Sequence, residues 1–215
     1  MIIAVDGPAA AGKGTLARRL AAHYGLAHLD TGRIYRATAL ATFDAGSDPA
    51  DPVAAEAAAL RITPELLGDR RLSEERIAQA ASVVAAIPGV RAALLAFQRD
   101  FARHPPGGLR GAVLDGRDIG TVVCPDADAK LYVQASPEAR AKRRFKELRA
   151  AGVEAIYERV LQDMTDRDAR DSQRRTAPLR PADDAFVLDT TALDAEAAYA
   201  AAITYIDGKI AGKSL

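Results

Sequence analysis

Residues 7–15 have the composition of a loop that binds phosphate groups. Its glycines permit the positive φ angles that turn several backbone N–H groups toward one point, and the N-terminus of a following helix also attracts anions. Lys13 supplies positive charge for the β- and γ-phosphates of a nucleotide. The candidate nucleotide-binding residues are Gly7, Pro8, Ala9, Ala10, Ala11, Gly12, Lys13, Gly14 and Thr15.

One glycine separates Lys13 from Thr15, whereas the general phosphate-loop pattern places Ser or Thr directly after the lysine. This departure favours the form of the loop that small-molecule kinases use. The alternative is a glycine-rich turn with an exposed lysine. That alternative does not explain why an apolar strand pattern precedes the loop and an amphipathic helix pattern follows it.

A second polar segment, residues 30–36, follows the next apolar run. Ligands of open α/β sheets bind at the carboxyl ends of the strands, so this segment is expected to face the phosphate loop. Arg36 is placed to receive a second phosphate group, with Thr31 and Tyr35 beside it. The alternative for Arg36 is a solvated arginine near the start of a helix.

Residues 115–120 form a third polar segment after an apolar run. Asp115 occupies the position at which phosphate-loop proteins hold an acid near Mg²⁺. Thr15 is the other candidate magnesium residue, and either contact is expected to be direct or through water. Arg117 and Asp118 leave the same strand end. A simple turn accounts for the two glycines of this segment but not for two acids and an arginine around them.

Residues 166–175 carry a dense run of charge. On a helix, Arg167, Arg170, Asp171 and Arg174 are spaced i, i+3, i+4 and i+7, which places them on one face. A charge run of this kind is usually a solvated surface. Beside a phosphate loop, the competing interpretation is a mobile lid whose arginines stabilise a phosphoryl group in transfer.

The elements that position these segments form an α/β pattern. Five short apolar runs alternate with helical patterns, which favours a mostly parallel sheet in one domain; the runs span 2–6, 27–29, 112–114, 130–133 and 185–188. Two stretches, 61–90 and 143–180, do not fit the alternation and are expected to be lobes inserted on the sheet. The core then comprises about 1–60, 91–142 and 181–215.

Composition excludes several classes of protein. The 215 residues carry no formal net charge, so no nucleic-acid or membrane partner is expected. A single cysteine, Cys124, rules out an internal disulfide and fits a reducing cytosol. We see no signal peptide or apolar span, and therefore expect a cytoplasmic protein. The chain contains no Asn, so it cannot supply the Asn-Lys-x-Asp guanine reader of a GTPase.

Taken together, these segments resemble bacterial cytidylate kinases along essentially the whole chain. The resemblance is carried by residues 6–15, 30–36, 80–91, 115–123 and 167–174, with Ala177-Pro178-Leu179. It implies a three-layer phosphate-loop fold with a five-stranded parallel sheet, an inserted nucleotide-binding lobe at about 61–90 and a short, arginine-rich lid at about 143–180. It also implies phosphorylation of CMP and dCMP by ATP with Mg²⁺, in a monomer.

The resemblance also implies roles for individual residues. Ser82, Arg91 and Asp118 would read cytosine, and the chemistry agrees, because Asp118 can accept from the exocyclic amino group while the other two donate. The acceptor monophosphate and its sugar would contact Thr31, Tyr35, Arg36, Arg117, Arg167, Asp171 and Arg174. The residues expected to act on the transferred group are Lys13, Arg170 and Arg174.

Two alternatives stay open on the residues alone. One is another phosphate-loop kinase, for UMP, AMP or an acceptor that is not a nucleotide, and the other is a regulator that binds nucleotides without turnover. The stretch 61–76 is shorter than in long members of the family. An arginine expected there has only Arg71 and Arg76 as candidates.

Overall fold

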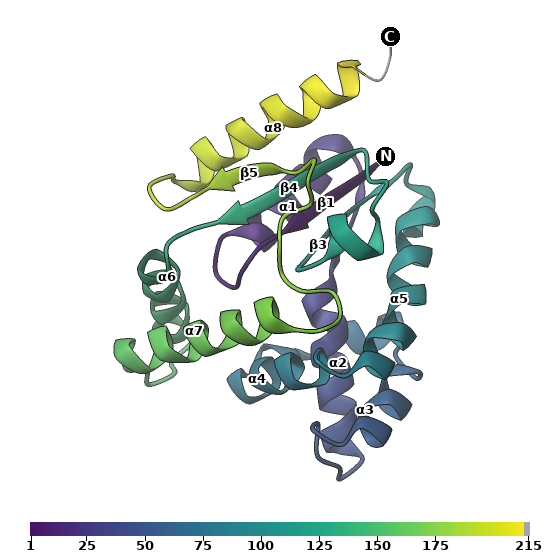
Figure 1. Ribbon diagram of the computed structural model, residues 1–215, viewed down its shortest axis with the longest axis vertical. Coiled ribbons are helices and arrows are strands. Elements are labelled where there is room, and N and C mark those ends of the chain that lie inside the picture. The colour runs from purple at the N-terminus through teal and green to yellow at the C-terminus, as the bar shows by residue number, and fades with distance from the viewer. Residues whose placement is uncertain (213–215) are drawn as a thin grey trace.

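The computed structural model describes residues 1–212. Its centre is a five-stranded, all-parallel sheet in the order β2-β3-β1-β4-β5, with helices on both faces (Figure 1). The strands are β1 (Ile2–Asp6), β2 (Ala27–Asp30), β3 (Ala112–Gly116), β4 (Ala129–Gln134) and β5 (Phe186–Asp189). The predicted parallel sheet is confirmed, and each strand lies within two residues of its apolar run.

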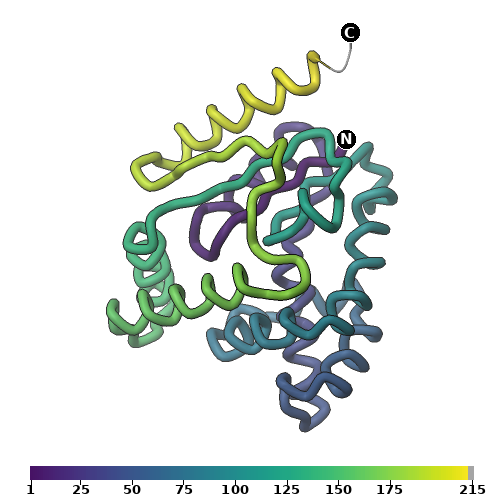
Figure 2. The backbone as a smooth tube through the Cα atoms, in the orientation of Figure 1, coloured from purple at the N-terminus to yellow at the C-terminus, as the bar shows by residue number. Residues whose placement is uncertain are grey.

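Eight α-helices connect and cover these strands within the described residues. They are α1 (Lys13–Tyr24), α2 (Thr31–Asp44), α3 (Pro52–Ala59), α4 (Glu75–Val84), α5 (Pro88–Arg103), α6 (Pro137–Ala150), α7 (Tyr157–Gln173) and α8 (Ala195–Gly212). Short 3-10 turns occur at Pro64–Gly68, Arg70–Ser73 and Pro106–Gly108, and a π-helical turn occurs at Ile119–Val123. The chain path is easiest to follow in the tube view (Figure 2).

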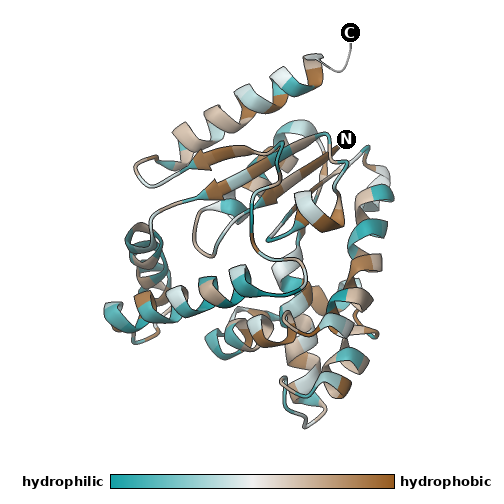
Figure 3. Ribbon diagram, viewed as in Figure 1, coloured by the Kyte–Doolittle hydropathy of each residue, from teal (hydrophilic) through white to brown (hydrophobic). Residues whose placement is uncertain are grey.

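Side-chain alternation along β1 builds a separate core on each face of the sheet. Ile3 and Val5 point into a cluster with α1 and α8, whereas Ala4 belongs to a cluster with α2, α4 and α5. Successive strand residues point to opposite faces, so one apolar strand serves both cores. Figure 3 shows the strands as a largely hydrophobic centre within more polar helices.

Local signals explain where several helices begin and end. Gly12 adopts φ 95° just before α1, and Gly25 ends that helix in the left-handed region at φ 62°. The hydroxyl of Ser136 accepts from the Ala139 N–H at the start of α6, where Pro137 follows it. Caps and first-turn prolines of this kind satisfy or remove backbone donors that a helix end leaves unpaired.

The helical face predicted for residues 167–174 is wrong at its C-terminal end. The helix α7 stops at Gln173, and Arg174 leaves it with an extended backbone at ψ 134°. The returning chain supports this exit, because the Leu179 N–H donates to the carbonyl of Asp171 near the helix end. Arg174 therefore reaches its surroundings from a turn and not from the helical position i+7.

No single described helix is long and apolar enough to cross a membrane. Two segments joined by a sharp bend, 75–84 and 88–108, together have the length and apolar composition of a membrane span.

Candidate functional site

A cavity of about 1560 Å³ opens at the carboxyl end of the sheet. It lies among the phosphate loop, the N-terminal parts of α2 and α4, the end of β3, and the helices α6 and α7. All four polar segments identified in the sequence contribute lining residues: Gly12, Lys13, Gly14 and Thr15; Asp30, Gly32 and Arg36; Asp115, Gly116 and Arg117; and Asp166, Arg167 and Arg170. Segments far apart in the sequence therefore share one site, as parallel α/β topology predicts.

The phosphate loop has the backbone that its composition predicted. Gly7 and Gly12 have φ angles of 144° and 95°, and Ala10 also has a positive φ of 55°. The Lys13 ammonium is buried and donates to the Pro8 carbonyl at 2.7 Å. Burial, followed by the nearby charge of Arg117, lowers the pKa of Lys13 to about 7. An anion in the loop would restore the countercharge that Lys13 lacks.

Three arginines of the polar segments are short of hydrogen-bond acceptors. The Nε atoms of Arg36 and Arg167 and the Nη2 atom of Arg174 are buried and meet no hydrogen-bond acceptor among the described residues. Burial lowers the pKa of all three, that of Arg167 to about 10. Buried polar groups without partners are costly, so these donors indicate an anionic ligand that the protein alone does not provide.

Arg117 and Asp171 link the strand end to helix α7. The Nε of Arg117 donates to the Asp171 carboxylate at 2.9 Å. Burial by itself would raise the pKa of Asp171, but Arg117, Arg167 and Arg174 hold it below its usual value. The predicted Arg117, Asp171 and Arg174 therefore do meet, with Arg174 Nη1 at 3.9 Å from the Asp171 carboxylate.

A second polar group lies deeper, where α4 and α5 meet the end of β3. Arg91 donates to the Asp118 carboxylate, and both side chains are at most 8% exposed. Arg91 also donates to the Ala85 carbonyl and lies over the ring of Tyr35, 5.6 Å from its centroid. The Ser82 hydroxyl is buried and makes no hydrogen bond among the described residues. This group offers a carboxylate acceptor and free donors to a planar polar ligand.

Asp6 supports the loop that carries Asp118. Its carboxylate accepts from the backbone N–H groups of Ile119 and Gly120 at 2.8 and 2.7 Å. Complete burial raises the pKa of Asp6 to about 7, and the two N–H groups oppose that rise. The carboxylate thus anchors the π-helical turn 119–123 to β1.

Residues 3–207 match the cytidylate kinase family. The chain belongs to this family. Among curated relatives, the cytidylate kinase of Paramagnetospirillum magneticum is 62% identical over 208 residues and covers 97% of this chain and 98% of that protein. The cytidylate kinase of Rhodospirillum rubrum is 58% identical over 209 residues, covering 97% and 98% of the two chains. That of Bradyrhizobium diazoefficiens is 54% identical over 214 residues, covering 100% and 99%.

A solved structure supports the fold alone. An uncharacterized protein from Eubacterium ventriosum aligns with a TM-score of 0.54 at 15% identity, covering 96% of this chain and 98% of the other.

The candidate magnesium residues have a setting that suits this ion. Thr15 and Asp115 both line the cavity beside Lys13. The Asp115 carboxylate is 2.7 Å from Nε2 of His28, and its backbone carbonyl accepts from the Thr31 hydroxyl at 2.8 Å. Among the described residues no cluster of three metal-ligating side chains occurs. This donor set fits Mg²⁺, which usually takes one or two protein ligands together with substrate phosphates and waters.

The structure shows contacts and exposure for several predicted site residues that the sequence did not indicate. The Thr31 hydroxyl is engaged by the Asp115 carbonyl, and Tyr35 is buried beneath Arg91. Arg170 is exposed and lines the cavity. Of the two candidates in the shortened stretch, Arg76 lines the cavity, whereas Arg71 pairs with Asp69 and Asp44 outside it.

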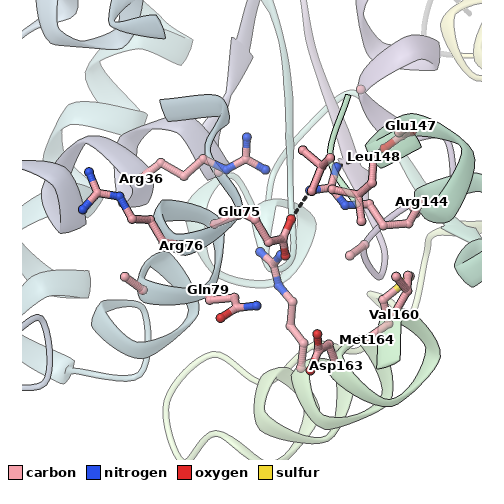
Figure 4. A pocket seen from close by; sticks show the side chains of 18 of the residues that line it. Arg36, Glu75, Arg76, Gln79, Arg144, Glu147, Leu148, Val160, Asp163 and Met164 are labelled. Carbon is pink, nitrogen blue, oxygen red and sulfur yellow. Dashed lines mark hydrogen bonds and ion pairs between the residues drawn. The ribbon is translucent and has the colours of Figure 1, made fainter. Parts of the chain in front are cut away.

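Sequence reasoning missed a contact across the cavity. Glu75 at the start of α4 accepts from Arg144 of α6, and Figure 4 shows its carboxylate between the α4 and α6 sides of the cavity. Arg144 also bonds Glu147 one helical turn later. The signal was available, because Arg140, Arg143 and Arg144 recur at i, i+3 and i+4, a spacing that places them on one helix face.

Proposed function

We propose that this chain transfers the γ-phosphoryl group of ATP to CMP and dCMP, forming CDP and dCDP. The observation that carries the proposal is a set of three arginines with buried nitrogens that lack acceptors: Arg36 and Arg167, which line the cavity with the phosphate-loop Lys13, and Arg174 beside Asp171. Family membership supports the same activity.

The phosphate loop would hold ATP. Its residues 7–15 provide inward-turned backbone donors and the helix N-terminus of α1, and Lys13 would contact the β- and γ-phosphates. Thr15 and Asp115 would hold Mg²⁺, directly or through water, and the ion would supply positive charge for the nucleotide phosphates.

The acceptor nucleotide would lie between the loop and the α4–α5 side. Arg36, Arg117 and Arg174 would bind its phosphate, with Thr31 and Tyr35 adjoining, and Arg167 and Asp171 would adjoin the sugar. Ser82, Arg91 and Asp118 would recognise cytosine, whose exocyclic amino group donates to the Asp118 carboxylate. UMP would place a carbonyl oxygen against that carboxylate, and two facing acceptors are strongly unfavourable.

Catalysis then needs no general base on the protein. The attacking atom is a phosphate oxygen that is already anionic near neutral pH, so no proton has to be removed from it. The chain contributes alignment and charge neutralisation, through Lys13 and through Arg170 and Arg174. Closure of the lid, about 143–180, over the insert, about 61–90, would exclude water that otherwise hydrolyses ATP.

The proposal extends to the metabolic role, compartment and partners of the enzyme. We place the enzyme in pyrimidine nucleotide metabolism, in the cytoplasm, as a monomer that binds small nucleotides and neither nucleic acid nor membranes. The single cysteine, Cys124, is buried and free, which fits a reducing compartment.

The direct test of the phosphate loop is Lys13→Ala. We expect a loss of about 1000-fold or more in kcat for CDP formation, since one preorganised charge of this kind contributes about 10²–10³ or more. Lys146→Ala, an exposed lysine of α6 outside the cavity lining, is the matched control and should keep wild-type turnover. Circular dichroism verifies that both variants are folded. Near-wild-type turnover by folded Lys13→Ala would contradict the assignment.

A further inference from the structure

A single buried arginine of α6 joins the phosphate loop to the lid helix. The Nε of Arg140 donates to the Ala135 carbonyl at 2.9 Å, and Nη1 donates to the Ala9 carbonyl at 3.3 Å. Its Nη2 lies 2.7 Å from the Asp168 carboxylate of α7, and the Arg140 side chain is only 5% exposed. The guanidinium therefore contacts three separate segments, and its planar fork suits several acceptors at once.

The contact with Ala9 affects the direction of the phosphate-loop backbone. In a trans peptide the carbonyl and the next N–H point in opposite directions. Because Arg140 holds the Ala9 carbonyl on its own side, the N–H of Ala10 is directed to the other side. Ala10 lines the cavity and has the positive φ of 55°. Arg140 thus helps to maintain a strained loop residue in the orientation that the loop needs.

The contact with Asp168 sets the rotation of α7 about its axis. Val160, Met164 and Asp168 follow one another at intervals of four residues, so they share the stripe that faces α6. The first two pack with Ala141 in an apolar cluster, which also includes Ala9 and Ala10 of the phosphate loop at its margin. The stripe ends in the ion pair with Arg140.

With this stripe held against α6, the residues on either side of Asp168 turn toward the cavity. Arg167 precedes it by one residue and Arg170 follows it by two, and both line the cavity. A rotation of α7 would carry both guanidiniums away from the nucleotide phosphates. The same pair therefore governs where the loop donors and the lid cations lie relative to each other.

We propose that Arg140 and Asp168 are positioning residues for phosphoryl transfer, which couple the phosphate loop to the lid helix through one ion pair between a buried arginine and a half-buried carboxylate. The inference rests on the proposed function. Stability alone is a weak reason for such a pair, because buried ion pairs replaced by apolar side chains are often no less stable. Alignment is a stronger reason, since a displacement of about 1 Å can cost about 100-fold in rate.

The test is Asp168→Asn compared with Glu158→Gln, an isosteric change at an exposed position of the same helix. We expect Asp168→Asn to lower kcat by about 10- to 100-fold while KM for CMP changes by less than about threefold. Glu158→Gln should match the wild type. Rates are normalised to the folded fraction, measured by circular dichroism, so that a lowered stability does not count as lost turnover.

A second arm separates positioning from a general structural effect. In an Arg170→Ala background the same Asp168→Asn change should lower kcat by a clearly smaller factor than in the wild type, because one of the cations that it positions is gone. An equal factor in both backgrounds, or wild-type kcat in Asp168→Asn, would overturn the inference. If Asp168→Asn does not fold, Arg140→Lys is measured instead, since one ammonium keeps the charge but cannot span the same three acceptors. A wild-type kcat in Arg140→Lys would equally overturn the inference. A wild-type protein that phosphorylates no CMP would refute the proposed function itself, which these variants do not address.

Discussion

Three arginines, Arg36 and Arg167 of the cavity and Arg174 beside Asp171, have side-chain nitrogens that are buried and without acceptors among the described residues. Their desolvation is already present before any ligand binds, so an anion gains contacts with donors that water does not compete for. Sequence spacing identified all three arginines as candidates. It could not show that they are buried, because burial depends on helices and turns that come from distant parts of the chain.

Base selectivity is a property of single residues as well. Asp118 is buried and paired with Arg91, so its carboxylate keeps a defined orientation. We predict that Asp118→Asn lowers the CMP-to-UMP ratio of kcat/KM by about 100-fold or more, because an amide can turn its donor toward the uracil carbonyl. The measurement is steady-state kinetics with both nucleotides.

The control for this prediction is Asp100→Asn on α5, where the carboxylate is 75% exposed and contacts only His104 among the described residues. It should leave the ratio unchanged. An unchanged ratio in Asp118→Asn as well would remove Asp118 from base recognition.

At the scale of elements, the strands were predictable, whereas the 3-10 turns within the segment 61–90 were not. An apolar run such as 2–6 can be satisfied only by burial on both faces, which is the environment of a central parallel strand. The 3-10 turns at Pro64–Gly68 and Arg70–Ser73 have no such periodic signal. The end of α7 was misjudged for a related reason, since the contact of Leu179 with Asp171 ends the helix and lies outside any local pattern.

The loop that follows β1 approaches the neighbouring strand β4 too closely to accept a side chain at Gly7. Gly7 has φ 144°, and a Cβ there would lie 1.9 Å from the carbonyl oxygen of Val133 in β4. Because Gly7 directly follows β1 and Val133 lies in the neighbouring strand β4, the sheet holds both backbones in place. We predict that Gly7→Ala lowers the free energy of unfolding by about 2–4 kcal/mol, measured by urea denaturation.

Gly208→Ala is the matched control for Gly7→Ala. Gly208 lies within α8, has no positive φ, and has open space where a Cβ would be. Alanine there should raise the free energy of unfolding by about 0.5–1 kcal/mol, as in other helix interiors. A Gly7→Ala protein as stable as the wild type would contradict the close approach of the loop to β4.

At the scale of the whole molecule, the site depends on contacts between segments that are distant in sequence. Arg140 reaches Ala9, Asp6 reaches the turn 119–123, and Glu75 of α4 reaches Arg144 of α6 across the cavity. The sequence predicted which strand ends would converge, because parallel topology brings them to one edge. It could not predict which side chains would bridge the helices above that edge, since those contacts depend on how α6 and α7 pack.

The central claim is that this protein selects CMP and dCMP as phosphoryl acceptors. The most direct measurement is transfer from ATP, with Mg²⁺, to a panel of CMP, dCMP, UMP and AMP under identical conditions. We predict that CMP and dCMP have kcat/KM values at least about 100-fold above those of UMP and AMP, as expected where a buried hydrogen-bonding site is mismatched. Equal or faster transfer to UMP or AMP, or no transfer to CMP, would contradict it.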